Sequence, residues 1–227
     1  MLVGAGVMMA GAAPLHWWGA RGIRRATPTP VAGARAAPGQ IGRTLRNAAF
    51  WMLAGVFALI SLNHWMVMSF LVPIFVQQGA LPATAVMAAA TVGPAQVAGR
   101  LVLMRWEARI GNAAATTATL FALVVGALIL TATGFGPVPV FAYVIVQGAA
   151  MGVVTILRPV LIGDVMGPEH YGTIAGAIQI PALVAGAVAP MLGALVLEGP
   201  GLTALMGLSF CLAVAALGLL VALRRQS

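Results

Sequence analysis

The chain has 227 residues, of which 61% are hydrophobic and 7% are charged. Soluble domains carry about 25% charged residues, so this composition excludes an ordinary water-soluble protein. The net charge of +8 comes from arginine, because the chain contains no lysine. A basic nucleic-acid-binding domain carries its charge on a polar surface, whereas these arginines stand between long apolar runs. We therefore expect a membrane protein that contacts lipid and does not bind nucleic acid.

The first 46 residues differ from the rest of the chain. Residues 1–18 are apolar and uncharged but too short to cross a bilayer, and arginines follow them. A secretory signal carries its positive charge before the apolar region, so we interpret 1–18 as the inner end of an incomplete transmembrane helix, whose upstream part is missing. Residues 19–46 are rich in Pro, Gly, Ala and Arg, which predicts a basic cytoplasmic linker.

Residues 47–227 form the predicted transmembrane domain, which is all α-helical. A spanning helix needs roughly 20 mainly apolar residues, and turn-forming glycines and prolines separate the apolar runs. Six such runs are present, at about 49–76, 83–103, 113–133, 138–163, 171–196 and 201–223.

The arginines predict the orientation of these spans. Arginine-rich loops stay in the cytoplasm, and the arginines lie before the first span, around the loop between spans two and three, late in span four, and after span six. The three opposite loops contain none. Six spans with both termini in the cytoplasm satisfy this distribution, which suits a multi-pass protein of the cell's inner membrane.

A short internal repeat relates spans two and five. Residues 94–99 read PAQVAG and residues 181–186 read PALVAG, so five of the six residues match. The two spans run in opposite directions, which predicts that spans one to three and four to six form two inverted three-helix repeats. A chance match in a chain rich in Ala, Gly and Val is the alternative interpretation.

Two junctions carry a family resemblance. Residues 93–100 (GPAQVAGR) resemble the signature of the major facilitator superfamily between the second and third helices of a half. A second stretch resembles that family's junction between the fourth and fifth helices, and it contains Arg158-Pro159, Asp164, Glu169 and Tyr171-Gly172. With the basic linker and the six spans, the chain resembles the C-terminal six-helix half of such a transporter.

This resemblance implies secondary transport of a small solute by alternating access around a site between two halves. The partner would be an N-terminal six-helix half or a second copy of this chain, and we favour a fragment of a longer carrier. A non-transporting assembly or regulatory subunit of the membrane is the alternative. No cofactor is implied.

Polar residues within the spans are the candidates for binding solute or coupling transport to protons. They are Asn63, His64, Gln147 and Gln179. Polar groups inside a membrane are costly and often functional, and the resemblance places the first and fourth spans beside the central cavity. Histidine also titrates near neutral pH. The alternative is that these side chains form hydrogen bonds between helices.

The candidates for a cytoplasmic gate are Arg100, Arg158, Asp164 and Glu169. Three interpretations of Arg158 are open. Its side chain extends to water, it forms an ion pair with Asp164 or Glu169 that breaks during transport, or it contacts an anionic substrate.

Other functional classes find little support. The chain has four serines, none in a GxSG setting, and no nucleotide-binding GxxxxGK[ST] loop. The three histidines are far apart, and one cysteine cannot form an internal disulfide. We therefore predict neither an enzyme nor a metal site.

Overall fold

The computed structural model describes Pro14 and residues 40–225. The chain divides into a unit at Met1–Ala37 and a unit at Pro38–Ser227. Apart from Pro14, the expected helix end at 1–18 lies outside the described residues, and so does most of the expected linker at 19–46. Apart from Pro14, the described residues all belong to the second unit.

The described residues of this unit form helices joined by short turns. In chain order the elements are α2 (Gln40–Leu45), α3 (Ala48–Ser69), α4 (Leu71–Gln77), α5 (Pro82–Thr131), a short 3₁₀ turn (Thr133–Phe135), α6 (Pro137–Met166), α7 (Tyr171–Glu198) and α8 (Leu202–Arg224). Six segments in this part of the chain are long and apolar enough to span a membrane: α3, two segments of α5 (Pro82–Glu107 and Arg109–Thr131), α6, α7 and α8. The predicted all-α fold with six spans is confirmed.

Two boundaries differ from the predicted runs. The first run, expected to be continuous over 49–76, is broken at Phe70 between α3 and α4. Pro73 explains the break, because its ring would clash with the carbonyl of Ser69 four residues earlier. Spans two and three join within α5, where Gly111 has a φ of 73° and interrupts the helical backbone. Glycine suits that left-handed conformation because it has no Cβ.

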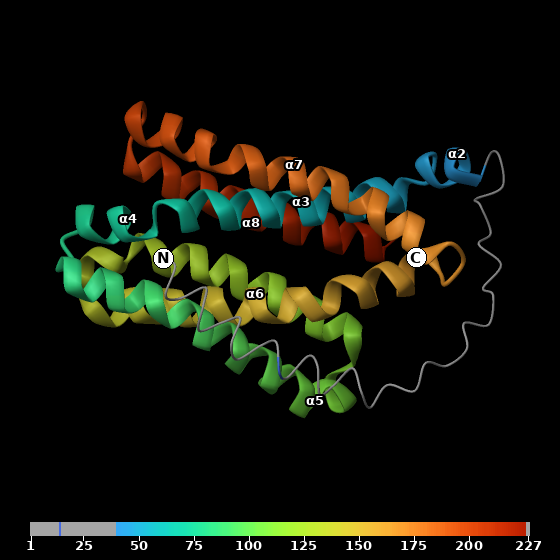
Figure 1. The fold of residues 1–227 in the computed structure, drawn as a ribbon, viewed down its shortest axis with the longest axis horizontal. Helices are drawn as coiled ribbons and strands as arrows, with labels where there is room; N and C mark the ends of the chain where they lie inside the picture. Colours follow the sequence, from blue (N-terminus) through green and yellow to red (C-terminus); the bar gives the residue numbers. More distant parts are fainter. Residues whose placement is uncertain (1–13, 15–39, 226–227) are drawn as a thin grey trace. The chain divides into compact units, whose positions relative to one another are not determined.

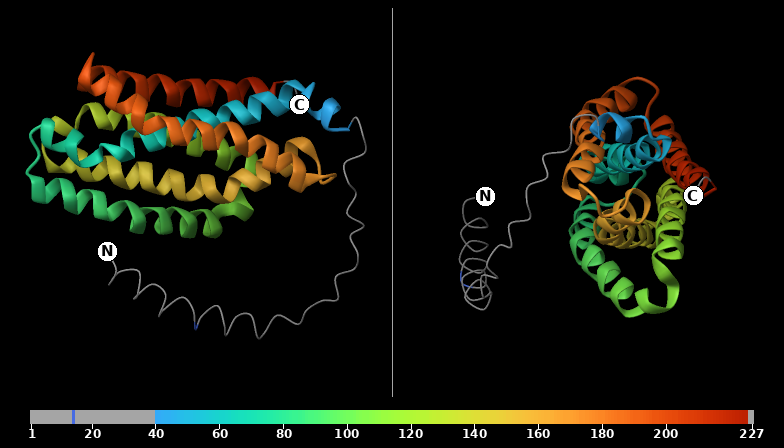
Figure 2. Two further views of the ribbon diagram at one scale, coloured as in Figure 1. Left: turned by 45° about the horizontal axis from the view of Figure 1, so that its top comes forward. Right: turned by 90° about the vertical axis from the view of Figure 1, so that its right-hand side faces the viewer.

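The spans pack in two groups of three (Figures 1 and 2). One group holds α3, α7 and α8, and the other holds the two legs of α5 with α6. Within the first group α3 is central. Of its most apolar 18-residue stretch 61% is buried, compared with 17% for the corresponding stretch of α7. Figure 1 also places α2, the turn between the two legs of α5 and the end of α8 at the same end of the bundle. The arginines of these segments therefore share one end.

Close contacts at the repeated segments support the inverted repeat. In span two, Gly99 lies so close to the backbone of Ala149 in span four that a Cβ would overlap it. In span five, a Cβ on Gly186 would lie 2.9 Å from Trp65 Cδ1 in span one. Span two therefore packs on span four as span five packs on span one. An inverted repeat makes span one equivalent to span four, span two to span five and span three to span six. The group of spans one, five and six is then equivalent to the group of spans four, two and three, as two inverted triplets require.

Candidate functional site

One open hollow of about 570 Å³ gathers polar side chains from four spans. Its size lies within the roughly 300–1,000 Å³ typical of small-molecule sites. α3, the first leg of α5, α6 and α7 each supply part of its lining. The polar residues are Ser61, His64, Gln96, Thr155, Arg158 and Gln179.

Helical spacing explains why these side chains meet. Residues three or four positions apart lie on the same face of a helix. The α6 residues Met151, Thr155 and Arg158 follow this spacing, and so do Gln179, Leu183 and Gly186 of α7. Each helix therefore turns one stripe towards the hollow, and small residues such as Gly186 bring α7 close to α3.

Arg158 extends from α6 towards α7. Its Nη1 donates a 2.8 Å hydrogen bond to Gln179 Oε1. The guanidinium carbon also lies 4.9 Å from the centre of the Phe57 ring, which is within cation–π range. Its Nε is buried and has no hydrogen-bond partner among the described residues. The guanidinium therefore has donors that the surrounding helices leave unused.

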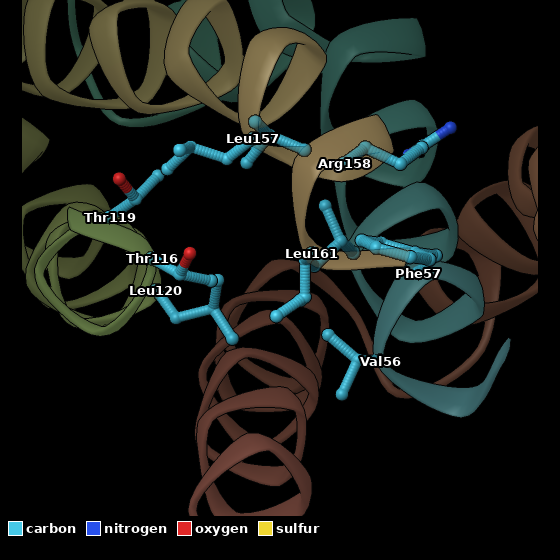
Figure 3. A pocket seen from close by; sticks show the side chains of 10 residues that line it. Val56, Phe57, Thr116, Thr119, Leu120, Leu157, Arg158 and Leu161 are labelled. Atoms are coloured by element: carbon cyan, nitrogen blue, oxygen red, sulfur yellow. The ribbon is translucent and has the colours of Figure 1, made fainter. Parts of the chain in front are cut away.

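The stem of Arg158 separates the hollow from a second, apolar pocket. Figure 3 shows that pocket, with the guanidinium pointing away from Thr116 and Thr119. Both threonine hydroxyls donate to carbonyls of their own helix, at Asn112 and Ala115 respectively. The two hydroxyls are thus engaged with their own helix, on the side away from the guanidinium.

His64 lies deeper in α3 on the same hollow. Its side chain is 8% exposed and meets Trp65 edge to face, with ring centroids 5.3 Å apart. The Nδ1 atom is buried without a partner in the described part of the chain. Because buried polar atoms are normally hydrogen-bonded, this nitrogen is an exception among the buried side-chain atoms of the described residues.

Two sequence candidates lie elsewhere. Ser209 of α8 donates a 2.7 Å hydrogen bond to Asn63 Oδ1, so Asn63 joins α3 to α8. Gln147 is 3% exposed, and its Oε1 lies 3.2 Å from where a Cβ on Gly126 would stand. Gln147 therefore faces the second leg of α5. Neither residue lines the hollow.

The remaining gate candidates are not among the residues that line the hollow. Arg100 Nε donates a 3.4 Å hydrogen bond to the Gly152 carbonyl and joins α5 to α6. The exposed Asp164 accepts a 3.4 Å bond from Asn112 Nδ2, and Glu169 is exposed in the turn before α7. Arg158 and Asp164 are six positions apart in α6 and so do not share a helical face. In this structure Arg158 bonds to Gln179 and not to Asp164.

Among the polar and aromatic lining residues, Trp65 and Thr155 were not predicted from the sequence. Ser61 donates a 2.7 Å bond to the Ala182 carbonyl, and Thr155 donates to the Gly152 carbonyl of its own helix. The spacing of three residues from Arg158 was the signal that could have found Thr155.

Comparison with known proteins gives one family. The sequence pattern of the Major Facilitator Superfamily matches residues 1–190, which is most of the chain. Members of that superfamily are membrane transporters of small solutes. No curated protein matches the chain.

Proposed function

The chain belongs to the major facilitator superfamily, and from this premise we propose that it moves a small solute across the cell's inner membrane by alternating access. The observation that carries the proposal is the convergence of polar side chains from four spans on one hollow. Polar groups at this depth are costly in lipid, and here they are grouped on one surface. The hollow would form one wall of the transport cavity.

The second wall would come from an N-terminal six-helix half or from a second copy of this chain. The lining residue Leu183 remains 63% exposed, and the neighbouring Val184 is 58% exposed. A face that is polar at the hollow and apolar around it suits a partner that encloses the solute and packs against the rim. Both termini would lie in the cytoplasm, since the arginine-bearing ends share one end of the bundle.

Uptake by the chain in reconstituted vesicles tests this function. The chain would be inserted alone and with a co-expressed N-terminal half, and a mixture of small metabolites would be offered. We expect accumulation of at least one solute, and we expect His64→Ala to abolish it. A non-transporting subunit would accumulate nothing in either arrangement. Unchanged uptake and an unchanged pH profile in His64→Ala would remove that residue from the site.

A further inference from the structure

We propose that the hollow binds a small organic acid, with the solute's carboxylate held by the guanidinium of Arg158. The inference rests on the proposed transport function and adds the class of solute. Arg158 is the single charged side chain among the described residues that line the hollow, and none of them carries a carboxylate.

The guanidinium does not reach back towards the end of its helix. Arg158 lies eight residues before the last residue of α6, Met166, which is about 12 Å along the axis. Its partner Gln179 lies eight residues after the first residue of α7, Tyr171, which is the same depth. The side chain is therefore held across the bundle at its own level. The side chain does not extend along the helix towards its end, which is the ordinary arrangement for an arginine near a membrane boundary.

No acid of the protein neutralises this cation in the described structure. Asp164 bonds to Asn112, and Glu169 is exposed in the turn beyond α6. A cation left within a span is expensive unless it is paired. A bound anion would supply the missing charge, whereas a cationic solute would add a second positive charge beside the first.

The geometry of the donors also favours a carboxylate. Nη1 donates its hydrogen bond to Gln179, and the guanidinium lies over the face of the Phe57 ring. Nη2 has no hydrogen-bond partner in the part of the chain that the structure describes, and it is not among the fully buried atoms. Guanidinium groups pair well with carboxylates through parallel N–H donors. The hollow is the side from which an acceptor can approach, because the pocket behind Arg158 is apolar (Figure 3).

The rest of the hollow suits an organic molecule and not a bare ion. His64 lies seven residues beyond Phe57 in α3, which separates it from the level of the guanidinium by about 10 Å. Between these levels the lining includes Ser61 and the carbon surfaces of Met151 and Ala182. A solute with its carboxylate at Arg158 and a polar or aromatic end towards His64 and Trp65 would fill this length.

Charge-matched probes test the solute class. The purified chain in lipid nanodiscs would be titrated with lactate, benzoate and phenylacetate, each beside its neutral amide and its cationic amine analogue. Thermal stabilisation and quenching of tryptophan fluorescence would both be recorded, since Trp65 lines the hollow. We expect at least one carboxylate to bind about tenfold more tightly than its amide, because hydrogen bonds to a charged group are the stronger kind. If no carboxylate binds better than its amide, or if an amine binds best, the proposal is wrong.

Variants of Arg158 test whether its positive charge holds the carboxylate of the solute. Arg158→Gln should weaken carboxylate binding by about tenfold or more, and Arg158→Lys should retain part of it. Arg225→Gln, at the exposed end of α8, is the matched control and should bind like the wild type. Carboxylate binding that survives in Arg158→Gln would contradict the assignment. Uptake that prefers amides or amines would overturn the solute class and leave transport intact, whereas selective carboxylate binding without uptake would overturn transport and leave the solute class intact.

Discussion

Gly152 of α6 lies directly against the backbone carbonyl of Gln96 in α5, with no space for a side chain between them. Gly148, one turn earlier, is similarly close, since a Cβ there would lie 2.9 Å from the Val92 carbonyl oxygen. Small residues let helix backbones approach and gain van der Waals contact in membranes. This contact seats α6 on the first leg of α5, and it therefore fixes where Gln96 and Arg158 stand around the hollow.

Replacing this glycine should destabilise the bundle. In Gly152→Ala, the added methyl group would overlap the Gln96 carbonyl and force the helices apart, at a cost of about 1–3 kcal/mol. Gly207→Ala in α8 is the matched control, because the Cβ it would add has no atom within 4 Å apart from its chain neighbours and the adjoining backbone of its own helix. It should be neutral or slightly stabilising. Thermal unfolding followed by circular dichroism in detergent measures both, and equal melting temperatures would contradict the close contact.

The hydrogen bond between Ser209 and Asn63 should act in stability and not in solute binding. Removing either partner leaves the other buried without its 2.7 Å bond. Hydrogen bonds between membrane helices contribute about 0.6 kcal/mol on average and up to about 1.7. We expect Ser209→Ala and Asn63→Ala each to lower the melting temperature, and the double variant to lose less than the sum. Strictly additive losses, or a changed solute affinity in Asn63→Ala, would show that Asn63 does not serve this contact.

The sequence indicated the spans well because each is a long apolar run bounded by glycine or proline. It could not say which side of each span faces which neighbour. A soluble helix marks its buried face by amphipathic spacing, but a membrane helix is apolar on all sides. Asn63 and His64 were grouped as neighbours, yet adjacent residues point about 100° apart around a helix. The structure accordingly turns His64 to the hollow and Asn63 to α8.

A matched pair of glutamines tests the position of the site. Gln179 lines the hollow and accepts from Arg158, whereas Gln147 is buried against the second leg of α5. Gln179→Ala should raise the half-saturating concentration of a transported solute by about tenfold, because the guanidinium loses a charge-assisted bond that holds it in place. Gln147→Ala should affect stability and leave that concentration near the wild-type value. Initial uptake rates, normalised to folded protein, measure both.

The opposite result for the two glutamine variants would assign the solute site to another position in the bundle. If Gln147→Ala impairs uptake and Gln179→Ala does not, the solute passes between α6 and the second leg of α5. Gln179→Glu adds a sharper comparison, because a carboxylate at this position would pair with Arg158 and compete with an anionic solute. We expect it to weaken carboxylate binding more than Gln179→Ala does.

Arg224 should hold the end of α8 against the second leg of α5. Its guanidinium donates to Thr117 Oγ1 and to the Ala113 carbonyl. A cation in the last turn of a helix is also favoured by the helix dipole. In Arg224→Gln, we expect faster amide hydrogen exchange over the last two turns of α8 and around Ala113, with little change in the hollow. Arg225→Gln should leave exchange at the wild-type rate, because the Arg225 side chain forms no hydrogen bond or ion pair with the described residues. Equal exchange in both variants would mean that the contact of Arg224 does not restrain α8.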